Sequence, residues 1–225
     1  MRKWWDLGDD AVLVDCSDDA DAAALAQLIR RDAPAWIVDL VCSYRSVAIF
    51  FDPERVTWAS VAEYLQSPQT DESLSENARR LHQIPCCYER QLDMVRVTSH
   101  AGISIDEVIH LHTCQDFTIY AIGFCPGFPY LGYLPTQLSG VPRLDRPRLV
   151  VEPGSVALTG HQTGIYPLAR PGGWNIIGQT PLILADPEDE FFPLQVGDRI
   201  RFVRITESEF RSLHGERLAV SAIRG

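Results

Sequence analysis

Short apolar runs alternate with helical patterns along the first part of the chain. Three runs have the length of strands, and they occupy residues 11–16, 36–42 and 46–51. Residues 19–31 carry apolar side chains at helical spacing, and Thr57 begins a second such stretch, whose apolar stripe includes Trp58, Val61 and Leu65. The order β-α-β-β-α predicts a small α/β domain of the ferredoxin-like kind.

A polar segment separates this part from the rest of the chain. Residues 67–75, SPQTDESLS, contain a proline and read as a linker or as the exposed start of a helix. We therefore expect a domain boundary near residue 80, with an N-terminal α/β domain over 1–80 and a second domain over 81–225. The length of 225 residues suits two modest domains.

The second domain opens with a strand-like run and a helix. Residues 84–88 resemble a strand, and Ser104 with Glu107 has the spacing of a capping box. The helix that follows carries four residues on one face, which are Ile105, Val108, Ile109 and His112.

Beyond this helix the pattern changes to short strands and tight turns. Residues 123–178 hold ten of the fifteen glycines and eight of the fifteen prolines. Strand-length runs occupy 155–159, 174–177, 181–185 and 199–205. Such punctuation breaks long helices and favours an antiparallel barrel or sandwich. The fold class expected for the whole chain is α+β.

Charge and apolar content narrow the classes of function. Twenty basic and thirty acidic residues give a net charge of −10, and no basic stripe is visible that could neutralise a phosphate backbone. Nucleic acid is therefore not an expected partner. Acidic residues interrupt the N-terminal segment before a signal-peptide core develops, and no apolar stretch reaches the length of a membrane span. A cytoplasmic protein without a membrane partner is expected.

The cysteines and histidines do not predict a metal site. No Cys-x-x-Cys pair occurs among the six cysteines, which are expected to be reduced. His110, His112 and Cys114 alternate, but the helical pattern places residues two apart on nearly opposite sides. We expect His112 to pack in the core and His110 to face solvent.

Several catalytic motifs are missing from the sequence. Its single lysine, Lys3, lies far from the glycine-rich segments, so a phosphate-binding loop of the Walker type is absent. The Gly-x-Ser-x-Gly and His-Glu-x-x-His motifs are also absent. No cofactor is expected in this chain, and any ATP and Mg²⁺ should bind a partner.

The candidate site lies in two glycine-rich segments, 123–132 and 152–181. Their rings, amides and hydroxyls are suited to recognise a small amide or carboxylate or to meet a partner. The candidate binding residues are Phe124, Phe128, Tyr130, His161, Gln162, Thr163, Tyr166 and Trp174. The alternative, slightly favoured on physical grounds, is that they only shape barrel corners and a subunit interface. No paired acid and base is evident, so the catalytic residues stay undetermined.

Five motifs, spread over nearly the whole chain, occur in the same order as in a known protein family. They are LGDDAVLV, YRSVAIFFDP, IGFCPGFPYLG, QTGIYP and PGGWNIIG. With them the sequence resembles the KipI family, also called PxpB or allophanate hydrolase subunit 1. The resemblance implies a small α/β domain followed by a cyclophilin-like β-barrel. It also implies a KipA, or PxpC, type partner and a LamB/YcsF, or PxpA, type partner.

The activity implied by the resemblance is that of one component of a bacterial ATP-dependent 5-oxoprolinase, which opens 5-oxoproline to glutamate. Two alternatives stay open: a KipI-type inhibitor of a sporulation histidine kinase, and a component of an allophanate or urea-amide hydrolase. The sequence departs from the family pattern at Gln179, where arginine is common, and at Glu152, where alanine is usual. Losing that arginine removes a fixed charge that could hold a carboxylate.

Overall fold

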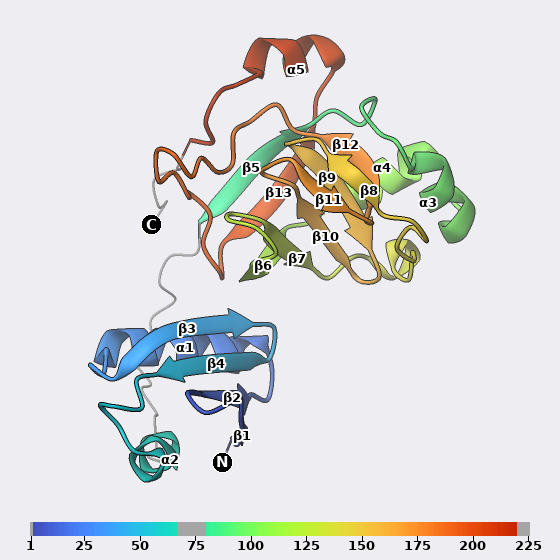
Figure 1. The fold of residues 1–225 in the computed structure, drawn as a ribbon. Helices are drawn as coiled ribbons and strands as arrows, with labels where there is room; N and C mark the ends of the chain where they lie inside the picture. Colours follow the sequence, from blue (N-terminus) through green and yellow to red (C-terminus); the bar gives the residue numbers. More distant parts are fainter. Residues whose placement is uncertain (1, 67–79, 220–225) are drawn as a thin grey trace. The chain divides into compact units, whose positions relative to one another are not determined.

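The computed structural model describes residues 2–66 and 80–219, and the chain divides into two compact units, 1–77 and 78–225 (Figure 1). The polar segment 67–75, expected to be a linker, lies outside the described residues.

The first unit is a four-stranded antiparallel sheet with two helices. Its elements are β1 (Lys3–Asp6), β2 (Ala11–Asp15), α1 (Asp19–Asp32), β3 (Ile37–Ser43), β4 (Ser46–Phe51) and α2 (Trp58–Gln66). The strand order is β1-β2-β4-β3. Helix α1 begins where the Asp18 carboxylate accepts a hydrogen bond from the Asp21 amide, and it buries Leu25 and Ile29.

The ferredoxin-like prediction for this unit is not confirmed. A split β-α-β unit of that kind places a last strand after its second helix. In the described residues a strand that the apolar pattern did not reveal, β1, pairs with β2 from the N-terminal side, with Lys3 opposite Asp15. The alternation in β1 is weak because Trp5 and its neighbours are largely exposed.

The second unit is built around a seven-stranded sheet of order β12-β9-β10-β7-β6-β13-β5. Its strands are β5 (Leu81–Cys86), β6 (Phe117–Ile122), β7 (Pro129–Gly132), β9 (Ser155–Thr159), β10 (Gln162–Ile165), β12 (Asn175–Gln179) and β13 (Arg199–Arg204). A separate ribbon pairs β8 (Arg148–Val151) with β11 (Arg170–Gly172). The helices are α3 (Met94–Ala101), α4 (Ile105–Thr113), α5 (Glu207–Leu213) and the 3-10 turn η1 (Thr136–Leu138).

The two edges of this sheet meet and nearly close a barrel. Just beyond β5, the Cys87 amide donates to the Gln179 carbonyl at 2.8 Å, and the Gln179 amide donates to the Cys87 carbonyl at 3.0 Å. Closure of this kind removes the unpaired edges of an open sheet. The expected antiparallel arrangement is found except at one pair of strands, because β13 pairs with β5 in parallel.

The barrel interior holds the larger core. It is filled by apolar side chains from successive strands and is covered on one side by α3 and α4 (Figure 1). Helix α4 begins at the predicted cap, where the Ser104 hydroxyl accepts from the Glu107 amide, and it buries Val108, Ile109 and His112 as expected. Ile105 is exposed instead. The strand expected over 181–185 is not formed. Within this described segment, the only ladder contact is an isolated bridge between Ile183 and Arg217.

Candidate functional site

Five of the eight candidate residues meet in one group of rings, called here the aromatic cluster: Phe124, Phe128, Tyr130, Tyr166 and Trp174. The Phe128 ring lies at its centre. Its centroid is 4.9 Å from that of Tyr130, 5.1 Å from Tyr166 and 5.6 Å from Trp174, all with edge-on geometry. Phe124 contacts Phe128 at 5.5 Å. The two glycine-rich segments therefore do come together in space.

Glycines make room for these rings. A Cβ atom on Gly164 would lie 3.0 Å from the Phe128 ring and 3.1 Å from that of Trp174. A Cβ on Gly172 would lie within 2.3 Å of the Tyr166 hydroxyl. Gly172 needs to be glycine because a Cβ would occupy the space of the Tyr166 ring, and at Gly164 a Cβ would also lie 2.9 Å from the Pro129 carbonyl oxygen.

Most of the cluster is buried. Phe128, Tyr166 and Trp174 are at most 5% exposed, and they form a second core with Val151 of β8 and Ile176 of β12. Phe124 is 57% exposed and Tyr130 is partly buried. What the cluster offers to a ligand or partner is thus mainly the Phe124 ring and the Tyr130 side chain.

The remaining three candidates lie elsewhere. Thr163 precedes Gly164 on β10 and points to the opposite face of the strand, so it is fully buried among interior groups. His161 is exposed in the turn before β10, where its carbonyl accepts from the Leu134 amide. Gln162 is partly exposed at the first position of β10. The eight candidates therefore do not form a single surface.

A positive charge lies beside the aromatic cluster. The Leu144 amide donates to the Gly173 carbonyl at 2.8 Å, which holds the segment around Arg143 next to Gly172, the glycine that accommodates Tyr166. Burial raises the pKa of Tyr130 and of Tyr166, and the Arg143 charge opposes that rise. Both phenols are therefore protonated at neutral pH. Arg143 was not among the sequence candidates, although three arginines in the proline-rich run 142–148 were a visible signal.

Inside the barrel, Thr163 belongs to a chain of three polar groups. The Thr163 hydroxyl donates to the Ala157 carbonyl at 2.9 Å, so it accepts from Nε2 of His112, also at 2.9 Å. Nδ1 of His112 is then unprotonated and accepts from the Tyr88 hydroxyl at 2.7 Å. Burial lowers the pKa of His112 to about 3. His112 is thus neutral and structural, as expected from its position on the helix.

Stability should therefore depend on pH through His112. The unfolded chain binds a proton at this histidine below its ordinary pKa of 6.5, whereas the folded chain does not until about pH 3. This contribution is fully present above pH 6.5 and falls by about 1.4 kcal/mol per pH unit below it. We expect His112→Gln to flatten the dependence of unfolding free energy on pH between 6.5 and 4.5, measured by urea denaturation.

The matched control is His110→Gln, since His110 lies exposed on the same helix. Its pH dependence should follow that of the parent protein. A His112→Gln slope equal to the parent slope would contradict the neutral, buried assignment.

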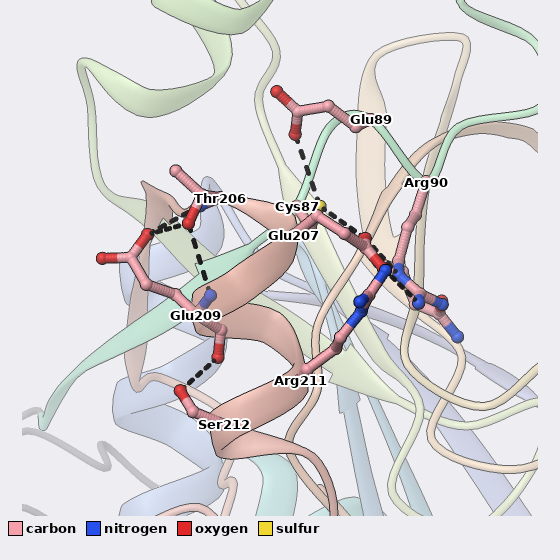
Figure 2. A network of polar contacts seen from close by, with 9 residues as sticks. Cys87, Glu89, Arg90, Thr206, Glu207, Glu209, Arg211 and Ser212 are labelled. Atoms are coloured by element: carbon pink, nitrogen blue, oxygen red, sulfur yellow. Dashed lines mark hydrogen bonds and ion pairs between the residues drawn. The ribbon is translucent and has the colours of Figure 1, made fainter.

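A second polar network connects α5 to the barrel seam, the place where Cys87 and Gln179 pair and the two edges of the sheet meet. Figure 2 shows Cys87, Glu89, Arg90 and Glu207 converging there. Arg90 donates from Nε and Nη2 to the two carboxylate oxygens of Glu207, each at 2.8 Å, and its guanidinium lies 4.0 Å over the Phe210 ring. The hydrogen bonds from Arg90 hold the pKa of Glu207 down at about 2. These contacts keep α5 against the seam.

Arg90 also contacts Gln179, the position where the family commonly has arginine. Nη1 of Arg90 donates to Oε1 of Gln179 at 3.3 Å, and the side-chain Nε2 of Gln179 donates to the Pro153 carbonyl at 2.9 Å. A guanidinium is therefore present beside position 179, but it comes from residue 90 and is paired with Glu207. It is committed to the fold rather than free to hold a carboxylate.

Cys87 should be unreactive despite its polar surroundings. Burial, together with a hydrogen bond to the Glu89 carboxylate, raises its pKa to about 11. Since the thiolate is the nucleophile, roughly one thiol in three thousand is reactive at pH 7.5. We expect iodoacetamide to label the exposed Cys114 in the native protein and to leave Cys87 unmodified, as read by peptide mass spectrometry. Equal labelling of both would contradict the placement of Cys87.

The described residues hold neither a cluster of metal ligands nor a helix suited to span a membrane. Within 2–66 and 80–219, no group of three or more His, Cys, Asp or Glu side chains is arranged to hold a metal ion. None of the helices described there has the length and apolar character needed to cross a bilayer.

Comparison with known proteins decides the family. Residues 3–194 match the family described as carboxyltransferase domain, subdomain C and D. The 5-oxoprolinase B subunit of Bacillus subtilis is 32% identical, over 93% of this chain and 95% of its own. That of Escherichia coli O157:H7 is 36% identical, over 88% and 93% of the two chains. The chain belongs to the family of 5-oxoprolinase B subunits.

Solved structures agree with this family assignment. The protein TTHA0988 is 32% identical with a TM-score of 0.75, and the match covers 91% of this chain but 40% of that one. A conserved uncharacterized protein from Pyrococcus horikoshii, PH0987, is 34% identical over 92% of this chain and its entire length, with a TM-score of 0.55. The Kluyveromyces lactis urea carboxylase, 18% identical with a TM-score of 0.71, covers 94% of this chain and 22% of that one, and shows the fold alone.

Proposed function

We propose that this chain is one component of an ATP-dependent 5-oxoprolinase complex that converts 5-oxo-L-proline to L-glutamate. The observation that carries the proposal is its identity of 32–37% with three bacterial proteins named as the B subunit of 5-oxoprolinase. Two of these matches cover nine tenths or more of the relative's length. A name that specifies one lettered subunit implies that others exist.

The other subunits supply the chemistry that this sequence lacks. We propose a KipA, or PxpC, type partner and a LamB/YcsF, or PxpA, type partner, with ATP and Mg²⁺ bound there. Support comes from the single lysine, Lys3, which leaves no phosphate-binding loop in the sequence. The family description, subdomains C and D of a carboxyltransferase domain, also implies that other subdomains reside elsewhere.

Within this chain, the exposed side of the aromatic cluster is the proposed contact with 5-oxoproline or with the partner that carries it. Phe124 offers a ring face, Tyr130 a protonated hydroxyl and Arg143 a positive charge. Such a set matches a small cyclic amide that bears a carboxylate. We propose no catalytic residue in this chain, because no acid and base pair converges on this surface among the described residues.

The test is to co-purify the chain with its native partners and assay the complex for ATP hydrolysis that depends on 5-oxoproline. Activity should require all subunits, and the isolated chain should bind Mg-ATP weakly or not at all in calorimetric titration. A complex that forms but hydrolyses allophanate instead would support the urea-amide alternative. Inhibition of a sensor histidine kinase without 5-oxoproline turnover would support the regulatory alternative.

The cellular and architectural details are part of the same proposal. We place the complex in the cytoplasm, and we assign the nearly closed barrel to the cyclophilin-like kind.

A further inference from the structure

Four apolar side chains of the second unit are strongly exposed on two neighbouring elements. Leu149 and Val150 of β8 are 88% and 58% exposed, and Leu92, two residues before α3, and Val95, in its first turn, are 66% and 70% exposed. These four residues are called here the apolar face. Single exposed apolar residues are ordinary, but four on adjoining segments mark a surface that meets a partner.

Direct contacts hold the two halves of this face together. Nη2 of Arg148, the residue before Leu149, donates to Oδ1 of Asp93 at 2.8 Å, and Asp93 lies between Leu92 and Met94. The second oxygen of Asp93 accepts from the Ile176 amide at 2.7 Å. Because the Asp93 carboxylate is buried, this ion pair fixes β8 beside the N-terminal turn of α3. The apolar face is therefore a preorganised surface.

Arginines without carboxylate partners border the face. Arg143 and Arg146 are exposed and make no ion pair with any residue of the described ranges. Arg80, Arg96 and Arg170 also make no such ion pair, whereas the other seven described arginines of this unit all pair with a carboxylate. Nη2 of Arg96, next to Val95, donates to the Arg143 carbonyl at 3.2 Å, which places the arginine-bearing loop along the face. In a chain of net charge −10, such unpaired cations favour an acidic counterpart.

We propose that the apolar face is the docking surface for the partner chain that carries the remaining carboxyltransferase subdomains, through an apolar centre on that partner and an acidic rim opposite Arg143 and Arg146. The proposal rests on the function proposed above. Its occupant follows from two observations: the family covers subdomains C and D, and this chain corresponds to 40% of TTHA0988, whose remainder lies in the same polypeptide.

The experiment measures affinity between this chain and the KipA-type partner by calorimetry or biolayer interferometry. We expect Leu149→Asp and Val95→Asp each to weaken binding about tenfold or more, since a charge at the centre of an apolar interface costs more than about 1.4 kcal/mol. An acidic residue in the first turn of α3 is compatible with the helix, so Val95→Asp should leave circular dichroism unchanged. Arg146→Glu should weaken binding and reduce its dependence on salt.

The matched control is Val38→Asp, because Val38 is also 70% exposed but belongs to the first unit. Unchanged affinity in Leu149→Asp and Val95→Asp, or an equal loss in Val38→Asp, would overturn the docking surface while leaving the proposed function intact. Failure of the parent chain to bind the partner would overturn both. A dimer of this chain alone that Leu149→Asp converts to a monomer would show that a second copy, not the partner, occupies the face.

Discussion

Asp93→Ala should lower the free energy of unfolding of the second unit by about 3–5 kcal/mol. The Asp93 carboxylate accepts from Nη2 of Arg148 and from the Ile176 amide, and it is 7% exposed. Nη1 of Arg148 is buried and has no hydrogen-bond partner in the described part of the chain. Removing Asp93 would also take away the carboxylate that pairs with Nη2, so the guanidinium would lose its ion pair. The cost is therefore mainly that of an uncompensated charge and an unpaired amide.

The control is Asp15→Ala in the first unit. Asp15 pairs with Arg45 at 3.1 Å, but the arginine side chain is 60% exposed, so its loss should cost less than about 1 kcal/mol. Urea denaturation followed by circular dichroism gives both values. Equal effects of the two substitutions would show that the Asp93–Arg148 pair is no more than a surface contact, and the apolar face would lose the contact that organises it.

Elements held by local interactions could be predicted from the sequence. Helix α1 and helix α4 carry their caps and their apolar faces within about a dozen residues, and the buried position of His112 follows from the same periodicity. The barrel itself was also foreseeable, because glycine and proline punctuate its strands. The closure of the barrel could not be predicted from the sequence. The parallel pairing of β5 with β13 joins segments more than a hundred residues apart, which no local pattern encodes.

The candidate site shows the same division between local and non-local information. The motifs located the aromatic cluster, since its rings come from two glycine-rich segments. Their burial depends on Val151 and Ile176, which reach the cluster from β8 and β12. The separation of Thr163 from Trp174 depends on which way β10 alternates, and glycine at 164 conceals that alternation. Arg143 and Arg148 belong to an arginine-rich run that is visible in the sequence, but the placement of Arg143 beside Tyr130 and of Arg148 beside Asp93 depends on tertiary contacts.

Trp174→Ala should destabilise the second unit by about 3–5 kcal/mol and lose any activity of the complex through unfolding. The indole is 5% exposed and packs edge-on against Phe128 and Tyr130 at 5.6 and 5.8 Å. The burial of the ring means that alanine at this position would not leave the fold intact. Trp174→Phe should recover much of the stability because it refills part of the cavity.

Phe124→Ala separates packing from recognition in the same cluster. Phe124 is 57% exposed and contacts Phe128 and Tyr166 from outside, with ring centroids at 5.5 and 6.1 Å. Its loss should change the free energy of unfolding by no more than about 0.5–1 kcal/mol, since no buried cavity is created. If the exposed side of the cluster contacts 5-oxoproline or the partner that carries it, this variant should raise the KM for 5-oxoproline or weaken assembly about tenfold while remaining folded. A Phe124→Ala complex with unchanged KM, turnover and affinity, beside an unfolded Trp174→Ala chain, would reduce the whole cluster to a second core that serves stability alone.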